Sequence, residues 1–237
     1  MRLSAPIFRL KRRAKRIARD RAIPLHAALD DLARQEGYES WSLLAAKASE
    51  NRPAADCLAR LVPGDLILLA ARPGQGKTVL ALEILVEHLR SGGQGIFFTF
   101  EYTGPEAEAR FLAAGGAAGD IGGRFRIDAS DPIGAEPIIA SLSKMPRGTL
   151  AVIDYLQLMD QPRETQPLAD QIEALHGIAR EAGMFLIFLS QIDRAFELST
   201  KVLPDLSDIR LPNPVDLARF DKACFLHQGR YRFETLA

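Results

Sequence analysis

The stretch that decides the fold is residues 71–78, which read Ala-Arg-Pro-Gly-Gln-Gly-Lys-Thr. An apolar run at 66–70 precedes it and predicts a buried strand, and residues 78–90 predict a helix. A glycine-rich loop between a strand and a helix is the setting of the pattern G-x-x-x-x-G-K-[ST], here with Ala71 at the first glycine position. The local sequence therefore predicts a phosphate-binding loop.

In such a loop, backbone N–H groups and the positive end of the helix attract anions. We expect Lys77 to reach the β- and γ-phosphates of ATP and Thr78 to offer its hydroxyl to Mg²⁺. The alternative is a glycine turn before a helix whose lysine is merely solvated. The full set of residues expected at the nucleotide is Arg72, Pro73, Gly74, Gln75, Gly76, Lys77, Thr78 and Val79.

Two carboxylates follow predicted strands. Residues 150–154 are an apolar strand that ends in Asp154, which we expect to orient Mg²⁺ and its water shell. Residues 95–100 are a second strand, and Glu101 follows it as a candidate base for the water that attacks the γ-phosphate. The alternatives are a turn-capping aspartate and a surface glutamate. Because ligand sites gather at the carboxyl ends of parallel strands, we expect both at one site.

A third polar residue ends a predicted strand. Gln191 follows the run 185–190 and is a candidate sensor of the γ-phosphate. The alternative is an amide that only satisfies backbone groups.

Residues 53–237 alternate short apolar runs with helical stretches, which is typical of a mostly parallel α/β sheet flanked by helices. A closing hairpin is expected around Gln228-Gly229, from 223–226 and 231–233. Residues 1–52 differ and predict a small helical unit. Its first helix, over 3–22, carries one apolar stripe and many basic residues, which favour an acidic partner. A solvated face and a membrane-surface helix are the alternatives.

Composition limits the class of protein. The 237 residues carry 30 basic and 30 acidic side chains, and half the chain is apolar, enough for a large core. Cys57 and Cys224 occur in unlike contexts, so we expect reduced packing residues and no disulfide framework or metal cluster. No apolar run is long enough for a membrane helix, and no signal-peptide core follows the basic start. We expect a cytoplasmic protein without a membrane partner.

Several motifs together resemble the ATPase domain of DnaB-type replicative helicases, in the RecA-like superfamily. They are 69–73 with 76–78, Phe-Thr-Phe-Glu at 98–101, Val-Ile-Asp-Tyr-Leu-Gln-Leu-Met at 152–159, Leu-Ser-Gln-Ile-Asp-Arg at 189–194 and Leu-Ser-Asp-Ile-Arg at 206–210. The resemblance covers about residues 62–227. It implies a RecA-like fold, ATP and Mg²⁺ as cofactors, Lys77 and Thr78 on nucleotide and metal, Asp154 on Mg²⁺, Glu101 as base and Gln191 as sensor.

The resemblance also implies DNA, single-stranded by preference, as a partner and a ring or filament of copies. The chain departs from the family at residues 1–52 and in a late arginine-finger motif, for which only Arg230 and Arg232 lie in the corresponding region. We therefore do not expect processive unwinding. Two other hypotheses stay open: a slow ATP-dependent switch that binds a partner through its N-terminal helices, and a DNA-binding module with a vestigial ATPase core.

Overall fold

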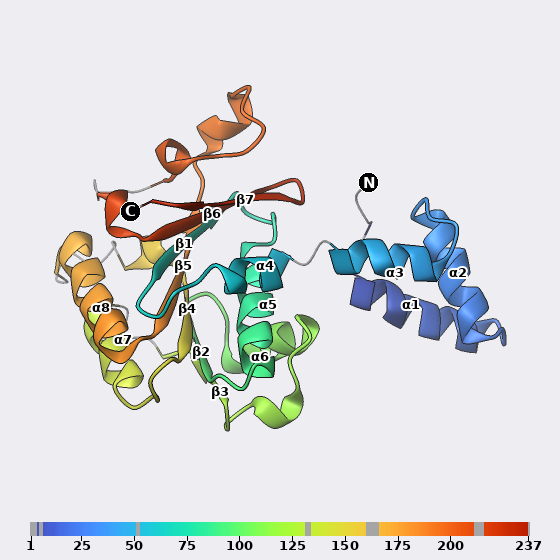
Figure 1. The fold of residues 1–237 in the computed structure, drawn as a ribbon, viewed down its shortest axis with the longest axis horizontal. Helices are drawn as coiled ribbons and strands as arrows, with labels where there is room; N and C mark the ends of the chain where they lie inside the picture. The colour runs from blue at the N-terminus through green and yellow to red at the C-terminus, as the bar shows by residue number, and fades with distance from the viewer. Residues whose placement is uncertain are drawn as a thin grey trace. The chain divides into compact units, whose positions relative to one another are not determined.

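The structure is a computed structural model that describes residues 4, 7–50, 53–130, 134–159, 166–210 and 216–236. The chain divides into two compact units, Met1–Pro53 and Ala54–Ala237, and each is described by itself. Figure 1 shows the helices of the first unit in blue and the sheet of the second. In the part of the chain that is described, no helix has the length and apolar character needed to cross a bilayer.

The first unit consists of three helices, α1 (Ile7–Asp20), α2 (Leu25–Gln35) and α3 (Trp41–Glu50). α1 ends at Asp20, before the predicted end at residue 22, because Arg21 and Ala22 form a turn in which Ala22 has a φ of 50°. Residue 3, where the predicted span begins, lies outside the described residues. Ser40 caps α3: its Oγ accepts a hydrogen bond from the Leu43 N–H at 3.3 Å.

The second unit is built on one seven-stranded sheet with the order β3-β2-β4-β5-β1-β6-β7. All neighbouring strands are parallel except β6 and β7, which form the predicted hairpin. The mostly parallel α/β fold is thereby confirmed. The strands are β1 (Leu66–Ala71), β2 (Gly95–Thr99), β3 (Phe125–Asp128), β4 (Leu150–Asp154), β5 (Phe185–Gln191), β6 (Lys222–His227) and β7 (Arg230–Thr235).

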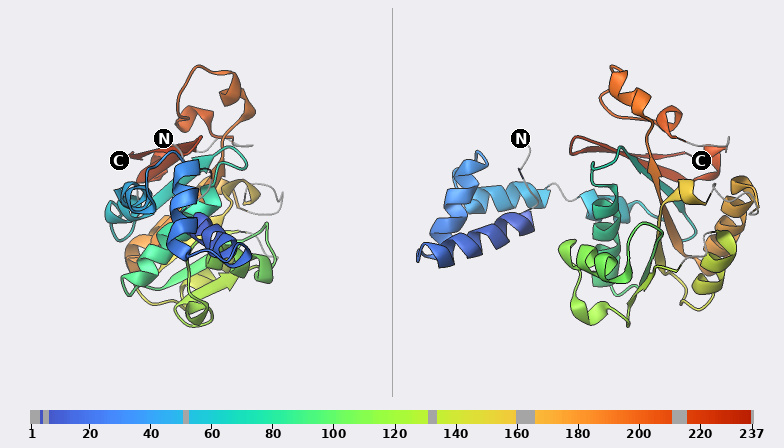
Figure 2. Two further views of the ribbon diagram at one scale, coloured as in Figure 1. Left: turned by 90° about the vertical axis from the view of Figure 1, so that its right-hand side faces the viewer. Right: turned by 180° about the vertical axis from the view of Figure 1, so that it is seen from behind.

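Helices cover both faces of this sheet, as the two views of Figure 2 show. Alternate side chains of β1 enter two separate cores, Leu66 and Leu68 on one face and Ile67 and Leu69 on the other. This follows from the two-residue period of a strand. α4 (Pro53–Ala59), α5 (Lys77–Arg90) and α6 (Gly104–Ala113) pack on one face, and α7 (Ala135–Leu142) and α8 (Leu168–Ala182) pack on the other.

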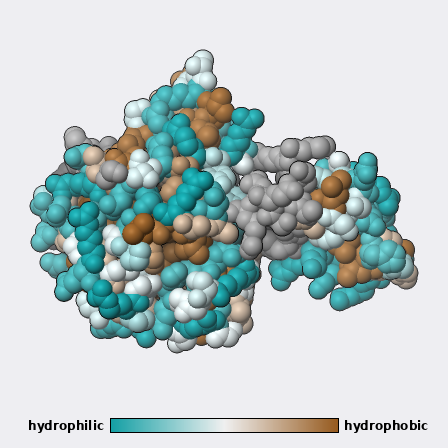
Figure 3. Space-filling view, in the orientation of Figure 1, coloured by the Kyte–Doolittle hydropathy of each residue, from teal (hydrophilic) through white to brown (hydrophobic). Residues whose placement is uncertain are grey.

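The surface of the second unit is mainly hydrophilic on the face that Figure 3 presents, where hydrophobic residues form only small patches between teal and white ones. The large apolar side chains lie inside instead: Phe97, Phe125, Phe188 and Phe225, all on strands, are fully buried. The helices on both faces of the sheet are therefore sufficient to enclose its apolar residues.

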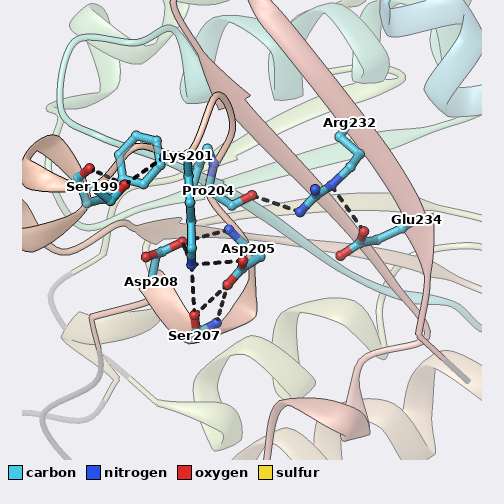
Figure 4. A network of polar contacts seen from close by, with 9 residues as sticks. Ser199, Lys201, Pro204, Asp205, Ser207, Asp208, Arg232 and Glu234 are labelled. Carbon is cyan, nitrogen blue, oxygen red and sulfur yellow. Dashed lines mark hydrogen bonds and ion pairs between the residues drawn. The ribbon is translucent and has the colours of Figure 1, made fainter.

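The described part of the long connection between β5 and β6 contains no α-helix or strand, and the sequence predicted neither there. It contains three short 3₁₀ turns, η3 (Arg194–Leu198), η4 (Leu206–Asp208) and η5 (Leu217–Arg219). The ammonium group of Lys201 lies 2.9 Å from a carboxylate oxygen of Asp205 and 2.9 Å from one of Asp208 (Figure 4). Two further 3₁₀ turns, η1 (Ala118–Asp120) and η2 (Leu156–Leu158), lie earlier in the chain.

Helix α4 is attached to the last two strands. The Tyr231 hydroxyl of β7 donates a hydrogen bond to Asp56 at 2.7 Å. Cys57 and Cys224 are both buried and free, as predicted, but their contexts are not separate: they share one core and their side chains contact each other. The first helix and the terminal hairpin of this unit are therefore packed as one element.

A buried ion pair joins β1 to β6 at the amino ends of the strands. Asp65 precedes β1, Lys222 begins β6, and their side chains form a direct ion pair. Asp65 also accepts a hydrogen bond from the Val62 N–H at 2.6 Å. Both residues are buried, at 7% and 8% exposure, so each charge depends on the other for compensation.

We predict that Lys222→Met lowers the free energy of unfolding by about 3 kcal/mol, because it leaves the Asp65 carboxylate buried without its partner. Urea unfolding followed by circular dichroism measures the change. Lys144→Met is the matched control, since Lys144 is exposed and its loss should cost under about 0.5 kcal/mol. Equal effects of the two substitutions would show that the ion pair is not needed for stability.

Candidate functional site

The strand order brings the predicted site residues to one edge of the sheet. β2, β4, β5 and β1 are consecutive neighbours, and the motifs follow their carboxyl ends. Thr99 at the end of β2 lies opposite Asp154 at the end of β4. Ala71, the first residue of the phosphate-loop motif, lies opposite Gln191 at the end of β5. The parallel strands thus bring together residues that are 55 and 120 positions apart in the chain.

The centre of this edge is a hydrogen bond between the phosphate loop and β4. The Thr78 hydroxyl, in the first turn of α5, donates to Oδ2 of Asp154 at 3.0 Å. Lys77 is half-buried beside it, and its ammonium group lies 5.7 Å from the centre of the Tyr155 ring. The positive charge of Lys77 also acts on the Asp154 carboxylate. Lysine, hydroxyl and carboxylate therefore form one polar cluster.

The second oxygen of Asp154 is buried and has no hydrogen-bond partner among the described residues. Burial raises the pKa of Asp154 from 3.8 to about 6; the Lys77 charge opposes this rise and the Glu101 charge adds to it. A carboxylate oxygen without a partner is costly unless a cation or its water meets it. Carboxylate and hydroxyl oxygens are ligands that Mg²⁺ accepts, with the remaining positions left to water and phosphate. Asp154 and Thr78 therefore fit a bound Mg²⁺.

The described residues contain no group of three or more His, Cys, Asp or Glu side chains that could hold a metal ion. A site that shares its metal with nucleotide phosphates needs no such group, because Mg²⁺ is commonly held by one or two protein ligands plus phosphate oxygens.

Glu101 lies just beyond β2 on the same edge. Its side chain is exposed. Burial raises the pKa of Asp154, Tyr155 and Tyr102, and the negative charge of Glu101 adds to each rise. Its backbone N–H lies 3.3 Å from the Thr99 hydroxyl, which fixes the turn that follows the strand. Glu101 thus acts on the cluster through its negative charge, while its side chain stays exposed to solvent.

The phosphate loop has the backbone that the motif requires. Gly74 and Gly76 have φ angles of 75° and 91°, which residues with a side chain rarely adopt. A Cβ added at either glycine would meet nothing within 4 Å, so the surface there is open. Pro73 is exposed, and Val79 is 38% exposed on the first turn of α5. The loop therefore leaves its backbone accessible to an anion.

Two side chains of the loop contact distant elements, which the sequence did not predict. The Arg72 guanidinium donates to Glu197 at 2.8 Å and to the Ile192 carbonyl at 3.1 Å. The Gln75 side-chain oxygen accepts a hydrogen bond from the Gln228 N–H, in the turn of the hairpin, at 2.8 Å. Arg72 and Gln75 were predicted only to contact nucleotide, and here they connect the loop to η3 and to the β6–β7 turn.

Gln157 holds the end of β5 in place. Its amide nitrogen donates to the Ser190 hydroxyl at 2.8 Å and to the Arg210 carbonyl at 2.7 Å. Its oxygen accepts from the Gln191 N–H at 3.3 Å. Gln157 is thus an amide that satisfies backbone groups, which is the alternative role that the sequence left open for Gln191. It belongs to the 152–159 motif, but no local pattern distinguished its role.

The arginines near this edge differ in their engagement. Arg232 lies 3.2 Å from Glu234, donates to the Pro204 carbonyl at 3.0 Å, and is therefore held within its own chain (Figure 4). Arg230 is exposed beside the hairpin turn, and Arg194 and Arg210 are exposed near the end of β5. Both candidates for a finger are exposed, but only Arg232 has described partners within its own chain.

Two aromatic residues at the site were not singled out by the sequence analysis. Tyr155 lies beneath Lys77, and Tyr102 lies beside Thr78 with Arg110 3.8 Å above its ring. Both tyrosines immediately follow a predicted site carboxylate, Asp154 and Glu101, and that position was the available signal. Their aromatic rings therefore lie against the polar cluster of Lys77, Thr78 and Asp154.

The comparisons with known proteins match the second unit. Residues 124–233 match the family model described as the DnaB-like helicase C terminal domain. A probable replicative DNA helicase of Trieres chinensis is 30% identical over 202 residues, covering 70% of this chain and 44% of the relative. The replicative DNA helicase DnaB of Geobacillus stearothermophilus is 27% identical over 199 residues, with the same shares of 70% and 44%. The chain spans less than half the length of these relatives.

Two solved structures agree in fold. A solved ATPase domain superposes with a TM-score of 0.58 at 20% identity, covering 79% of this chain and 81% of that one. A DnaB-like replicative helicase, studied for its interactions with primase, gives a TM-score of 0.60 at 20% identity, covering 92% and 66%. These likenesses confirm the RecA-like fold. The second unit of this chain therefore resembles the ATPase domain of DnaB-type replicative helicases, as its motifs predicted.

Proposed function

We propose that this chain is a Mg²⁺-dependent ATPase of the DnaB-like helicase type. The observation that carries the proposal is the Thr78–Asp154 pair, with its partnerless buried oxygen, between Lys77 and Glu101. The open backbone of Gly74 and Gly76 supplies the adjoining anion site.

The reaction follows from the positions of these side chains. The loop backbone and Lys77 bind the phosphates and stabilise the charge that develops on the transferred phosphoryl group. Thr78 and Asp154 would hold Mg²⁺, which would neutralise phosphate charge. Glu101, on the solvent side, orients the attacking water and accepts its proton. Gln191, opposite the start of the loop, reports the state of the γ-phosphate to the β5–β6 connection.

The partners proposed for this activity are DNA, with the single strand preferred, further copies of the chain in a ring or filament, and a protein bound by the N-terminal helices. The DNA and the assembly rest on the resemblance to the ATPase domain of DnaB helicases, and the protein partner rests on the small helical unit, in which the chain departs from that family. We place the activity in the cytoplasm.

A second candidate function is a slow nucleotide-dependent switch. The observation that favours it is the pairing of Arg232, one of two candidates for an arginine finger, with Glu234 and the Pro204 carbonyl of its own chain. A finger supplied in trans contributes about 10³–10⁵-fold to turnover in GTPases. Without one, ATP binding would change the shape or assembly of the chain, and hydrolysis would reset it slowly.

We predict that Glu101→Gln lowers the steady-state rate of ATP hydrolysis by about 10²-fold or more while ATP binding is retained, because a base is lost and the loop is not. Lys77→Ala should abolish turnover and weaken binding. The assay measures phosphate release with Mg²⁺, with and without single-stranded DNA, which should raise the rate of the unchanged protein several-fold.

Glu108→Gln is the matched control for this assay, since Glu108 is an exposed glutamate of the neighbouring helix α6 and takes no part in the site. Normal turnover in the Glu101→Gln protein would remove Glu101 from the mechanism. Normal turnover in the Lys77→Ala protein would overturn the proposed ATPase site as a whole.

Asp154→Asn should stabilise the metal-free protein at neutral pH and abolish its turnover. The folded-state pKa of Asp154, about 6, lies above the reference 3.8, so the ionised carboxylate disfavours folding above about pH 6. Asparagine removes that cost, of order 1–3 kcal/mol. Thermal unfolding in EDTA at pH 7.5 and pH 5 measures it, and the stabilisation should shrink at the lower pH.

Asp128→Asn serves as the opposite control, because hydrogen bonds from Ser130 and Ser141 hold the pKa of Asp128 below its usual value. Loss of the Asp128 carboxylate should therefore destabilise the protein at neutral pH. A lower melting temperature for Asp154→Asn than for the unchanged protein at pH 7.5 would contradict the unfavourable burial of Asp154.

The switch and the ATPase differ in a size measurement. If the chain is a switch, light scattering should show a nucleotide-dependent change in mass with a non-hydrolysable ATP analogue, together with negligible turnover. Appreciable turnover that DNA stimulates, lost in Lys77→Ala, would exclude the switch. Arg230→Ala tests the other candidate for a finger: a loss of turnover that is recovered by mixing with Lys77→Ala protein would assign that arginine to a neighbouring copy.

A further inference from the structure

Helix α1 has a buried apolar side and an exposed basic side. Its apolar side is buried within the first unit, where Leu10 packs with Ala33 and Leu44, and Ala14 packs with Ala28 and Leu32. The structure thereby accounts for the apolar stripe seen in the sequence as core packing. An amphipathic helix that binds a membrane surface must insert its apolar side into the lipid, and this one is already occupied.

The opposite side of α1 is basic and exposed. Positions four apart lie above one another on a helix, so Lys11, Lys15 and Arg19 form one row. Arg12 and Arg16 form the row beside it. Every one of these five side chains is exposed, as are those of Arg13 and Arg21. We call this set of seven residues the α1 basic face.

No ion pair among the described residues neutralises the α1 basic face, and Asp20 is the one acidic residue of α1 itself. Three carboxylates of the same unit are engaged elsewhere: Asp30 accepts from the Trp41 N–H at 2.9 Å, Asp31 from Arg34 at 2.9 Å, and Glu36 from the Ser4 N–H at 2.6 Å. In the second unit, arginines are widely paired with carboxylates, among them Arg60, Arg72, Arg90, Arg124 and Arg219. No described ion pair involves any of the seven residues of the α1 basic face, of which Arg21 lies in the turn just after α1.

This arrangement costs stability when the unit is alone. Like charges four residues apart on a helix disfavour it by about 0.2–0.5 kcal/mol per pair. Lys11–Lys15, Lys15–Arg19 and Arg12–Arg16 are three such pairs, and the first turn of α1 holds no acidic residue to favour its positive end. A polyanion laid along the helix would remove this repulsion.

We propose that the α1 basic face is a docking surface for the phosphate backbone of nucleic acid. A helix of 14 residues is about 21 Å long, a length over which duplex DNA carries about twelve phosphates. The face has no aromatic or amide side chain, so it binds backbone and reads no base sequence. The docking needs no nucleotide, and the surface is distinct from the ATP site proposed above.

The test is the binding of the full chain, without nucleotide, to a fluorescein-labelled duplex of about 30 base pairs and to one of its strands, between about 50 and 200 mM salt. The triple variant Lys11→Gln, Lys15→Gln, Arg19→Gln should bind at least tenfold more weakly at low salt. The slope of log K against log salt should fall by about 2–3, since each phosphate contact contributes about 0.7–0.9.

The matched control is Arg126→Gln, Lys144→Gln, Arg147→Gln, which removes three exposed charges from the second unit. Unchanged binding by this variant, and retained binding by Lys77→Ala, support the proposal. The α1 variant should also keep its melting temperature and its ATP turnover measured without DNA, because glutamine is a good helix former and repulsion is relieved. Loss of turnover in Lys77→Ala and loss of docking in the α1 variant are thus separate readouts.

Three results would overturn the proposal. One is an α1 variant that binds both DNA forms as the unchanged protein does. A second is an equal loss in the two triple variants, which would mean that net charge alone governs binding. A third is co-sedimentation with phosphatidylserine vesicles at a salt concentration where neither DNA form binds, which would assign the face to a membrane surface instead.

Discussion

The hydrogen bond from Thr78 to Asp154 is the contact on which the proposed ATP site depends. It joins the first turn of α5 to the end of β4 and thereby sets the phosphate loop against the carboxylate. The bond satisfies only one oxygen of Asp154, and the other is left buried. The fold therefore holds a charge in an unfavourable place, which is how binding sites commonly differ from ordinary cores. The strand order that makes this contact also brings Glu101 and Gln191 to the same edge.

The sequence predicted the parts of this site that are local. The strand, loop and helix around residues 71–78, the strand ends at Asp154 and Gln191, and the hairpin at Gln228-Gly229 all follow from periodicity and turn residues. The resemblance to helicases placed them in one fold. Their grouping at one edge follows from parallel strands, because carboxyl ends of such strands coincide.

What the sequence did not predict depends on contacts between distant segments. Gln157 satisfies Ser190 and Arg210, and Arg72 reaches Glu197, although neither pairing leaves a local pattern. The 3₁₀ turns between β5 and β6 were also not predicted. They depend on side chains such as Asp193 and Asp205, which accept hydrogen bonds from nearby backbone N–H groups. The boundary of α1 was misplaced because the basic residues continue past the point where Ala22 turns the backbone.

The attachment of α4 to β7 has a mechanical consequence. Residues 51 and 52 connect the first unit to α4, so any tension between the units enters the second unit at α4. The Tyr231–Asp56 hydrogen bond and the Cys57–Cys224 contact join α4 to the hairpin, in addition to the covalent connection from α4 to β1 through residues 60–65. The turn of the hairpin is bonded in turn to Gln75 of the phosphate loop. A ligand bound to the small helical unit would therefore have a short, bonded route to the proposed nucleotide site, whatever position that unit adopts.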